Sequence, residues 1–333
     1  MAMVEVKHAI ANTMDFGLVR IPYWQIESGV DGPRLLITCA QHSNEVQGSE
    51  AMRRFVPFAA QGLREGRIGI VPFCNKPALW KRRPHISSTP ERPYGDDAGH
   101  NMNRTWPGKA DGNDTERLSA AIYKALGEQA THNVDIHCWE RFTAACSLPR
   151  KDKPASMELA RVCALPFAQP RDGSSSAGKT PTMIGALFND SGRPSLTFEL
   201  SGQYIIYDRE VRWGLRAVMN VVKFLGMMDG EIEPPERPTV WLDNAEQVKV
   251  TAPSNGLFAR AQGLLTASPV KEGQVIGTLF SDDDLSTTEI KSPIEGFLYS
   301  YDCSRAHSDV SLAAQHPYAS QGDRLAVIVR PKA

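Results

Sequence analysis

The chain has 333 residues, 41% of them hydrophobic, which is enough for one large domain or two of ordinary size. Its 37 Lys and Arg residues nearly balance its 38 Asp and Glu residues, so no global field attracts nucleic acid or an anionic membrane surface. No stretch approaches the roughly 20 apolar residues that would span a bilayer, and we expect a cytoplasmic protein.

Apolar runs bounded by turn residues recur in the first half of the chain. The runs typical of buried strands are residues 35–40, 68–73 and 134–137. The stretches with helical spacing are residues 45–59, 115–130, 156–165 and 210–228. Strands that alternate with helices predict an α/β fold with a largely parallel sheet, in which ligands bind at the carboxyl ends of the strands.

A change in composition predicts a second domain. Residues 231–239 carry three prolines and three glutamates and are expected to link a catalytic domain, residues 1–233, to an accessory β domain, residues 240–333. Beyond this linker, the pattern of residues 250–258 recurs in residues 290–298, which predicts two similar β units about a pseudo-twofold axis.

This predicted β domain resembles the barrel-sandwich fold of biotinyl and lipoyl carriers. Those carriers need a modifiable lysine at an exposed hairpin tip. Lys291 directly precedes Ser-Pro inside an expected strand, so we predict no carrier role.

His42 and Glu45 lie three positions apart where the first expected strand gives way to a helix. His137 ends another expected strand and should therefore reach the same rim of the sheet. A zinc ion that catalyses hydrolysis needs three ligands of the His or Glu type and a fourth position open to water, and these residues supply that set. The alternative is a chance H-x-x-E pair and a core histidine.

Two acidic residues could act beside such a site. Asp135 shares a strand face with His137 and either orients the ligand ring or is a capping or buried, hydrogen-bonded aspartate. Glu199 lies in the apolar run 194–200, where an unpaired carboxylate would cost several kcal/mol, so we expect it at the mouth of the sheet or paired. A position at the mouth makes Glu199 a candidate general base.

A loop at residues 101–108 holds an amide and a guanidinium side by side, in Asn103 and Arg104. The planar fork of donors of an arginine suits a carboxylate, so this pair is a candidate substrate-binding element. The alternative is a structural loop with a solvated arginine.

Taken in order, these motifs resemble the signatures of the succinylglutamate desuccinylase and aspartoacylase family, relatives of the zinc carboxypeptidases. The resemblance covers roughly residues 30–230, and the appended β domain common in the family matches the repeat in residues 245–333. It implies a zinc-carboxypeptidase-like mixed sheet flanked by helices, followed by an all-β barrel-sandwich-like domain.

The resemblance also implies the roles of the site residues. One Zn²⁺ per chain would be held by His42, Glu45 and His137. Glu199 would be the catalytic base, and Asn103 with Arg104 would bind the carboxylate of the substrate.

Family members use a further arginine, before the Asn-Arg pair, to polarise the scissile carbonyl. Arg92 is our choice for this role, with Arg82 and Arg83 as rivals. The chain departs from the family pattern at Ser43, where Gly is usual, and at Trp106, where Phe is usual; neither touches an expected ligand.

The implied function is a zinc-dependent hydrolase that cleaves the amide bond of a small N-acyl amino acid or related N-acylated amine by metal-activated water. The acyl group, the amino acid and self-association into a homo-oligomer stay open. The alternatives are a metallocarboxypeptidase acting on peptides and a zinc-binding module without activity. A Cys-His amidase using Cys39 or Cys138 is disfavoured, because apolar strand contexts raise the pKa of a thiol.

Overall fold

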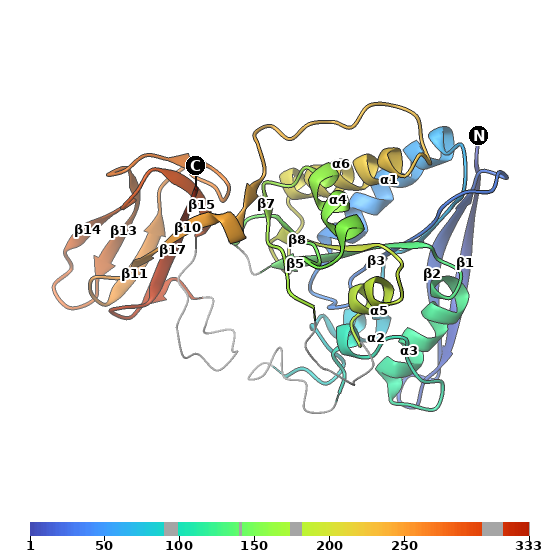
Figure 1. Ribbon diagram of the computed structural model, residues 1–333. Helices are drawn as coiled ribbons and strands as arrows, with labels where there is room; N and C mark the ends of the chain where they lie inside the picture. The colour runs from blue at the N-terminus through green and yellow to red at the C-terminus, as the bar shows by residue number, and fades with distance from the viewer. Residues whose placement is uncertain (90–98, 140–141, 174–181, 302–315, 333) are drawn as a thin grey trace.

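The computed structural model describes residues 1–89, 99–139, 142–173, 182–301 and 316–332. Within these residues a nine-stranded mixed sheet with helices on both faces is followed by two smaller four-stranded sheets (Figure 1). The large sheet consists of β1 (Met3–Asn12), β2 (Leu18–Glu27), β3 (Arg34–Cys39), β4 (Arg67–Val71), β5 (His132–Trp139), β6 (Cys146–Leu148), β7 (Phe167–Ala168), β8 (Ser195–Ser201) and β9 (Val240–Trp241).

The centre of the large sheet is parallel. Its strand order is β1-β2-β4-β3-β5-β8-β6-β7-β9, and β3 pairs in parallel with both β4 and β5, as β5 does with β8. The carboxyl ends of these four strands therefore meet at one edge. The prediction of an α/β fold with a mixed sheet is confirmed, and β3, β4 and β5 overlap the runs predicted as strands.

Helices cover both faces of the large sheet (Figure 1). They are α1 (Gln47–Gly62), α2 (Lys76–Lys81), α3 (Asp114–Ile122), α4 (Pro154–Cys163), α5 (Ile184–Asp190) and α6 (Asp208–Phe224). One hydrophobic core joins α1, α4 and α6 to the sheet, and a second joins α2, α3 and α5 to its other face. Among the described helices, none combines the length and apolar content needed to cross a bilayer.

Glycine brings α1 close to the sheet near the ends of the central strands. A Cβ atom at Gly48, in the first turn of α1, would lie 2.6 Å from the Ile136 side chain of β5. Only a glycine accommodates this approach without a shift of Ile136. The close packing holds the start of α1, and the loop before it, against the ends of β3 and β5.

The C-terminal strands form two antiparallel sheets. These strands are β10 (Ala245–Thr251), β11 (Gly256–Arg260), β12 (Pro269–Val270), β13 (Val275–Ser281), β14 (Thr287–Lys291), β15 (Gly296–Ser300), β16 (Tyr318–Ala319) and β17 (Arg324–Pro331). One sheet has the order β10-β17-β15-β12 and the other β14-β13-β11-β16. If β10, β11, β12 and β13 are exchanged in turn with β14, β15, β16 and β17, the strand order of one sheet becomes that of the other. Two repeated β units are expected to show this relation.

The two parts of the molecule are joined by backbone contacts. Residue Thr143 forms an antiparallel bridge with Ser300 at the end of β15, and the Ala144 N–H donates to the Tyr299 carbonyl at 2.7 Å. A second connection is the chain itself: β9 follows the proline-rich residues 231–239 and pairs in parallel with β7 of the large sheet. The chain therefore adds a strand to the large sheet before it enters the C-terminal sheets.

Candidate functional site

His42 and Glu45 lie in the short segment between β3 and α1. The backbone turns sharply after β3 because Ala40 adopts a left-handed conformation, with φ of 50°, and the Glu45 N–H then donates to the His42 carbonyl at 3.0 Å. His137 comes from β5, the parallel neighbour of β3. The prediction that the ends of these two strands bring the three side chains together agrees with this geometry.

The Glu45 carboxylate lies between the two imidazole rings. Its Oε1 is 3.0 Å from Nδ1 of His42, and its Oε2 is 2.8 Å from Nδ1 of His137. One potential ligand atom from each residue lies within 4.8 Å of the other two, so the three residues form a group that could hold a metal ion.

The second nitrogen of each imidazole faces a side-chain oxygen. His42 Nε2 lies 3.0 Å from Oδ1 of Asn101, and His137 Nε2 lies 2.8 Å from Oδ2 of Asp135. If Nε2 of His42 or His137 carries the proton and donates it to this oxygen, Nδ1 of the same neutral ring is unprotonated, and its lone pair can bind a cation. Asp135 thus orients a ring and is also a buried, hydrogen-bonded aspartate, so the two interpretations from sequence hold together.

Asp135 is itself held by two further donors. Its Oδ1 accepts from Thr38 Oγ1 at 2.7 Å and from Gln41 Nε2 at 2.6 Å. Gln41 in turn accepts at Oε1 from the indole N–H of Trp106 at 2.7 Å. The tryptophan that departs from the family pattern therefore adds a hydrogen bond, absent with phenylalanine, that ties the loop around residues 101–108 to the partner of His137.

The electrostatics of the group favour a positive charge between the carboxylates. Burial raises the pKa of Glu45, but the charges and hydrogen bonds of His42 and His137 outweigh it and hold this pKa below its ordinary range. Burial lowers the pKa of His137, yet the Asp135 and Glu45 carboxylates raise it well above its ordinary value. A divalent cation supplies the positive charge that these carboxylates attract, so the donor set fits a metal of the zinc type.

Glu199 lies beside His137 across the β5–β8 pairing, where the two residues are direct partners. Both side chains line a cavity of about 450 Å³ together with His42. Burial raises the pKa of Glu199 to about 8; His137 opposes this rise, Glu45 and Asp135 add to it, and Arg171 also opposes it. A carboxyl group with a pKa near neutrality, next to a candidate cation site, has the properties of a general acid–base group.

Asn103 and Arg104 also line this cavity. Asn103 Nδ2 lies 3.3 Å from His137 Nε2, and Arg104 is exposed with Nη1 donating to the Asn103 carbonyl at 2.7 Å. The remaining guanidinium donors of Arg104 therefore face the cavity or solvent. The amide and guanidinium predicted to bind a carboxylate lie at the wall of the pocket that contains Glu199.

The structure does not test the choice of Arg92 as the arginine that polarises the scissile carbonyl. Arg92 lies outside the described residues. Its rivals Arg82 and Arg83 do not line the cavity, and Arg83 Nη1 donates to the Ser88 carbonyl at 2.5 Å.

The cysteines expected of the amidase alternative are poorly placed for nucleophilic attack. Cys39 and Cys138 are buried, and burial raises the pKa of both thiols well above the ordinary value. A thiol of this kind stays protonated at neutral pH and is a weak nucleophile.

Sequence reasoning gave no role to Asn101 or Gln203. Asn101 holds His42, and Gln203 Nε2 donates to the Cys138 carbonyl at 2.9 Å and to Glu45 Oε1 at 3.3 Å. Asn101 was visible as the first amide of the motif that also contains Asn103. Gln203 follows the expected strand with Glu199, but nothing in its local sequence indicates a contact with Glu45.

Two arginines in the cavity were also missed. Arg150 is neutralised by Asp152, at 2.9 Å, and by Asp190, at 3.0 Å. Arg171 forms no ion pair with a described residue, and its charge acts on Glu199. Arg171 lies on an exposed segment after β7, and no motif in that segment indicated a functional residue.

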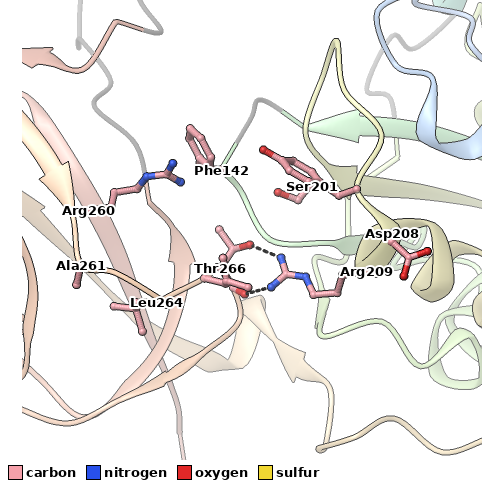
Figure 2. Close-up of a pocket in the computed structure, with 11 residues that line it drawn as sticks. Phe142, Ser201, Asp208, Arg209, Arg260, Ala261, Leu264 and Thr266 are labelled. Carbon is pink, nitrogen blue, oxygen red and sulfur yellow. Dashed lines mark hydrogen bonds between the residues drawn. The ribbon is translucent and has the colours of Figure 1, made fainter.

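A second cavity, of about 460 Å³, lies between α6 and the C-terminal sheets. Figure 2 shows Arg209 at the start of α6 bonding to the carbonyl and hydroxyl of Thr266, with Arg260 and Phe142 on the opposite wall. The cavity contains none of the proposed ligands or Glu199. Its arginine contact joins the two parts of the chain.

Comparison with known proteins connects this geometry to a family. Residues 31–225 match the succinylglutamate desuccinylase/aspartoacylase catalytic domain. The chain is 26% identical over 323 residues to the N-alpha-acetyl-L-2,4-diaminobutyric acid deacetylase of Halomonas elongata, covering 94% of this chain and 86% of that protein.

Solved structures share the fold over nearly the whole chain. An aspartoacylase family protein from Mesorhizobium loti superposes with a TM-score of 0.70 at 21% identity, covering 100% of this chain and 96% of that chain. The product-bound ectoine utilization protein EutE (DoeB) from Ruegeria pomeroyi superposes with a TM-score of 0.68 at 22% identity, covering 98% and 94%.

The catalytic-domain match covers more than half of the chain and includes the segments that carry His42, Glu45, His137 and Glu199. The chain therefore belongs to the succinylglutamate desuccinylase/aspartoacylase family.

Proposed function

We propose that this chain is a zinc-dependent deacylase that hydrolyses the amide bond of a small N-acyl amino acid or a related N-acylated amine. The observation that carries the proposal is one cavity that contains His42, His137 and Glu199, in a chain of this family. The deacetylase relative from Halomonas elongata supports an N-acylated amino acid as the substrate class.

In this proposal, one zinc ion is held by His42, Glu45 and His137. A bound zinc ion supplies a Lewis acid that polarises the amide carbonyl and lowers the pKa of water towards about 7. Asn101 and Asp135 keep the two imidazole rings oriented through their Nε2 atoms.

Glu199 performs the proton transfers in the proposed reaction. Its carboxylate takes a proton from the attacking water and returns it to the nitrogen of the leaving amine. The two steps need a group that both accepts and releases a proton near neutral pH. Burial raises the pKa of Glu199 to about 8, and a cation held beside it would lower this pKa towards neutrality. The products are a carboxylic acid and an amine.

Asn103 and Arg104 bind the carboxylate of the substrate in this proposal. The guanidinium offers two parallel N–H donors, and the neighbouring amide offers a third. Because Asn103 also contacts His137, a carboxylate held here brings the adjacent amide bond near the proposed zinc site.

We also propose that the chain divides into a catalytic domain, residues 1–233, and an accessory domain of the barrel-sandwich type, residues 240–333, without covalent biotin or lipoate. The accessory domain is supported by the matching strand orders of the two C-terminal sheets, which are related by exchanging β10–β13 with β14–β17. Lys291 ends β14 and pairs with Glu289 at 3.0 Å, away from any hairpin tip.

The proposal is tested by assaying amine release from a panel of N-acyl amino acids and from peptides with free carboxyl termini. Activity on acyl amino acids, lost on zinc removal and restored by zinc, is the expected result. Cleavage of peptides in preference to acyl amino acids would show a carboxypeptidase instead. A zinc-loaded chain that cleaves neither acyl amino acids nor peptides would favour the interpretation as a zinc-binding module without activity.

A further inference from the structure

The outer edge of β1 is a sheet edge that pairs with no other strand among the described residues. β1 is the terminal strand of the nine-stranded sheet and pairs only with β2 among the described strands. Its ten residues contain no proline or glycine, and all ten pair with β2 in one register without a bulge. Sheet edges of this length are usually shortened, bulged or covered, because their free N–H and C=O groups invite another strand.

One face of β1 is exposed and mainly apolar. Side chains alternate between the faces of a strand, so Val4, Val6 and Ile10 share a face, with exposed fractions of 37%, 61% and 47%. The exposed His8 lies on this face between Val6 and Ile10. On the opposite face, Ala9 and Ala11 are buried in the core that contains α3. The edge of β1 and its Val face are therefore the parts free to meet a partner.

We propose that two copies of this chain associate through β1, edge to edge and antiparallel, with Val6 on the twofold axis. A twofold axis between two identical antiparallel strands places one residue opposite its own copy. The residue on the axis then fixes every other pair.

The charges of β1 favour this register, because it is the one that sets Glu5 opposite Lys7 of the second copy. With Val6 on the axis, Glu5 lies opposite Lys7 of the second copy, and Lys7 lies opposite Glu5, so two attractive cross-strand pairs form. With Glu5 or Lys7 on the axis, a like-charged pair faces itself. Glu5 and Lys7 already form an ion pair at 2.9 Å within one strand, on half-exposed side chains, so the dimer joins two such pairs into a network of four charges.

The same register places one apolar pair on the axis. Val6 meets Val6 of the second copy, and Val4 lies opposite His8 on the same face. Cross-strand pairs of β-branched residues stabilise antiparallel sheets, and the backbone groups of both edges gain hydrogen bonds. The proposal does not depend on the deacylase function, because β1 contributes none of the residues that line the catalytic cavity.

The test is the oligomeric state of the full chain by sedimentation velocity across low to high micromolar concentration. The wild type is expected to be a dimer. Glu5→Lys or Lys7→Glu turns both interchain pairs repulsive and should raise the dimer dissociation constant by about tenfold or more. The double variant Glu5→Lys with Lys7→Glu restores opposite charges within and between chains and should return it to near the wild-type value.

A matched control is Glu246→Lys, which reverses one partner of an exposed antiparallel ion pair, with Arg330, between β10 and β17. It should leave the dimer unchanged, and thermal unfolding confirms that each variant is folded. A monomeric wild type would overturn the proposal. So would a dimer that neither single reversal weakens, or that the double exchange fails to restore.

Discussion

His42 and Asn101 are joined by a hydrogen bond of 3.0 Å between the imidazole Nε2 and the amide Oδ1. The same amide oxygen accepts the backbone N–H of Asn103 at 3.0 Å. One side chain therefore links a proposed zinc ligand to the loop that carries the proposed carboxylate-binding pair.

Asn101→Ala is expected to weaken zinc binding by about 10- to 100-fold, because His42 loses the acceptor that orients its ring. Asn101→Asp keeps an acceptor at the same place and should retain the affinity. Competition with a chromophoric chelator measures both dissociation constants without a substrate. Equal affinity in Asn101→Ala and the wild type would show that the bond to His42 does not orient a ligand.

Removing a proposed ligand should have a larger effect. His137→Ala leaves two of three protein ligands, so the purified variant should contain little zinc. Elemental analysis against the wild type, which should contain about one zinc per chain, decides the question. Full zinc occupancy in His137→Ala would make this histidine an ordinary core residue.

Glu199→Gln is expected to keep zinc and fold while kcat falls by about 10²-fold or more, because an amide cannot accept the proton from water. Glu158→Gln, which alters an exposed ion pair with Arg161 on α4, is the surface control and should leave kcat unchanged. Near-normal turnover of Glu199→Gln with normal zinc content would remove Glu199 from the mechanism.

The sequence predicted the parts of the site that depend on local order. One apolar run ends two residues before His42 and another ends in His137. Both indicated parallel strands, and the topology of parallel sheets brings the ends of such strands together. The helix after Glu45 was recognised from its periodicity. These features follow from short-range patterns and a general rule of α/β sheets.

Other features depend on contacts between distant segments and could not be predicted in this way. The acceptor of His42 lies 59 residues away, and Gln203 reaches Glu45 across 158 residues. The β1–β2 hairpin has the alternation of strands but was not predicted, since its charged residues resemble a solvated amino terminus. Hydrogen bonds of this range depend on the assembled fold and leave no periodic trace.

The pH dependence of catalysis follows from the environment of Glu199. A general base acts deprotonated, so kcat/KM should fall as the pH drops through the pKa of Glu199. Burial raises that pKa from 4.5 to about 8, and a cation held beside it acts in the opposite direction. The acid limb of the profile should therefore have its midpoint between these values.

Arg171 provides the check on this assignment. Its charge lowers the pKa of Glu199, so Arg171→Ala should shift the acid limb to higher pH, whereas Arg171→Lys should keep it near the wild-type position. Measuring kcat/KM from about pH 3.5 to about pH 9 spans both 4.5 and 8 and resolves the shift. An acid limb at 4.5 that Arg171→Ala does not move would show that another group titrates.

Arg104 lies at the wall of the cavity, where its guanidinium is proposed to bind the carboxylate of the substrate. If Arg104 and Asn103 hold the carboxylate of an N-acyl amino acid, each charge-assisted hydrogen bond contributes about 1.5–3 kcal/mol in the partly desolvated cavity. Arg104→Lys keeps the charge but loses the fork of donors. The value of kcat/KM should fall by roughly tenfold to a few hundredfold, at about 1.4 kcal/mol per decade, with zinc content unchanged.

A neutral carboxamide analogue of the substrate separates this contact from any other effect of Arg104→Lys. The wild type should lose much of its kcat/KM on the carboxamide, whereas the variant should lose little more, because an interaction already weakened cannot be lost twice. The four measurements form a double cycle whose coupling energy isolates the contact. If the wild type hydrolyses the carboxamide as well as the acid, Arg104 does not bind a carboxylate, and the proposed substrate class is wrong even where the zinc chemistry is right.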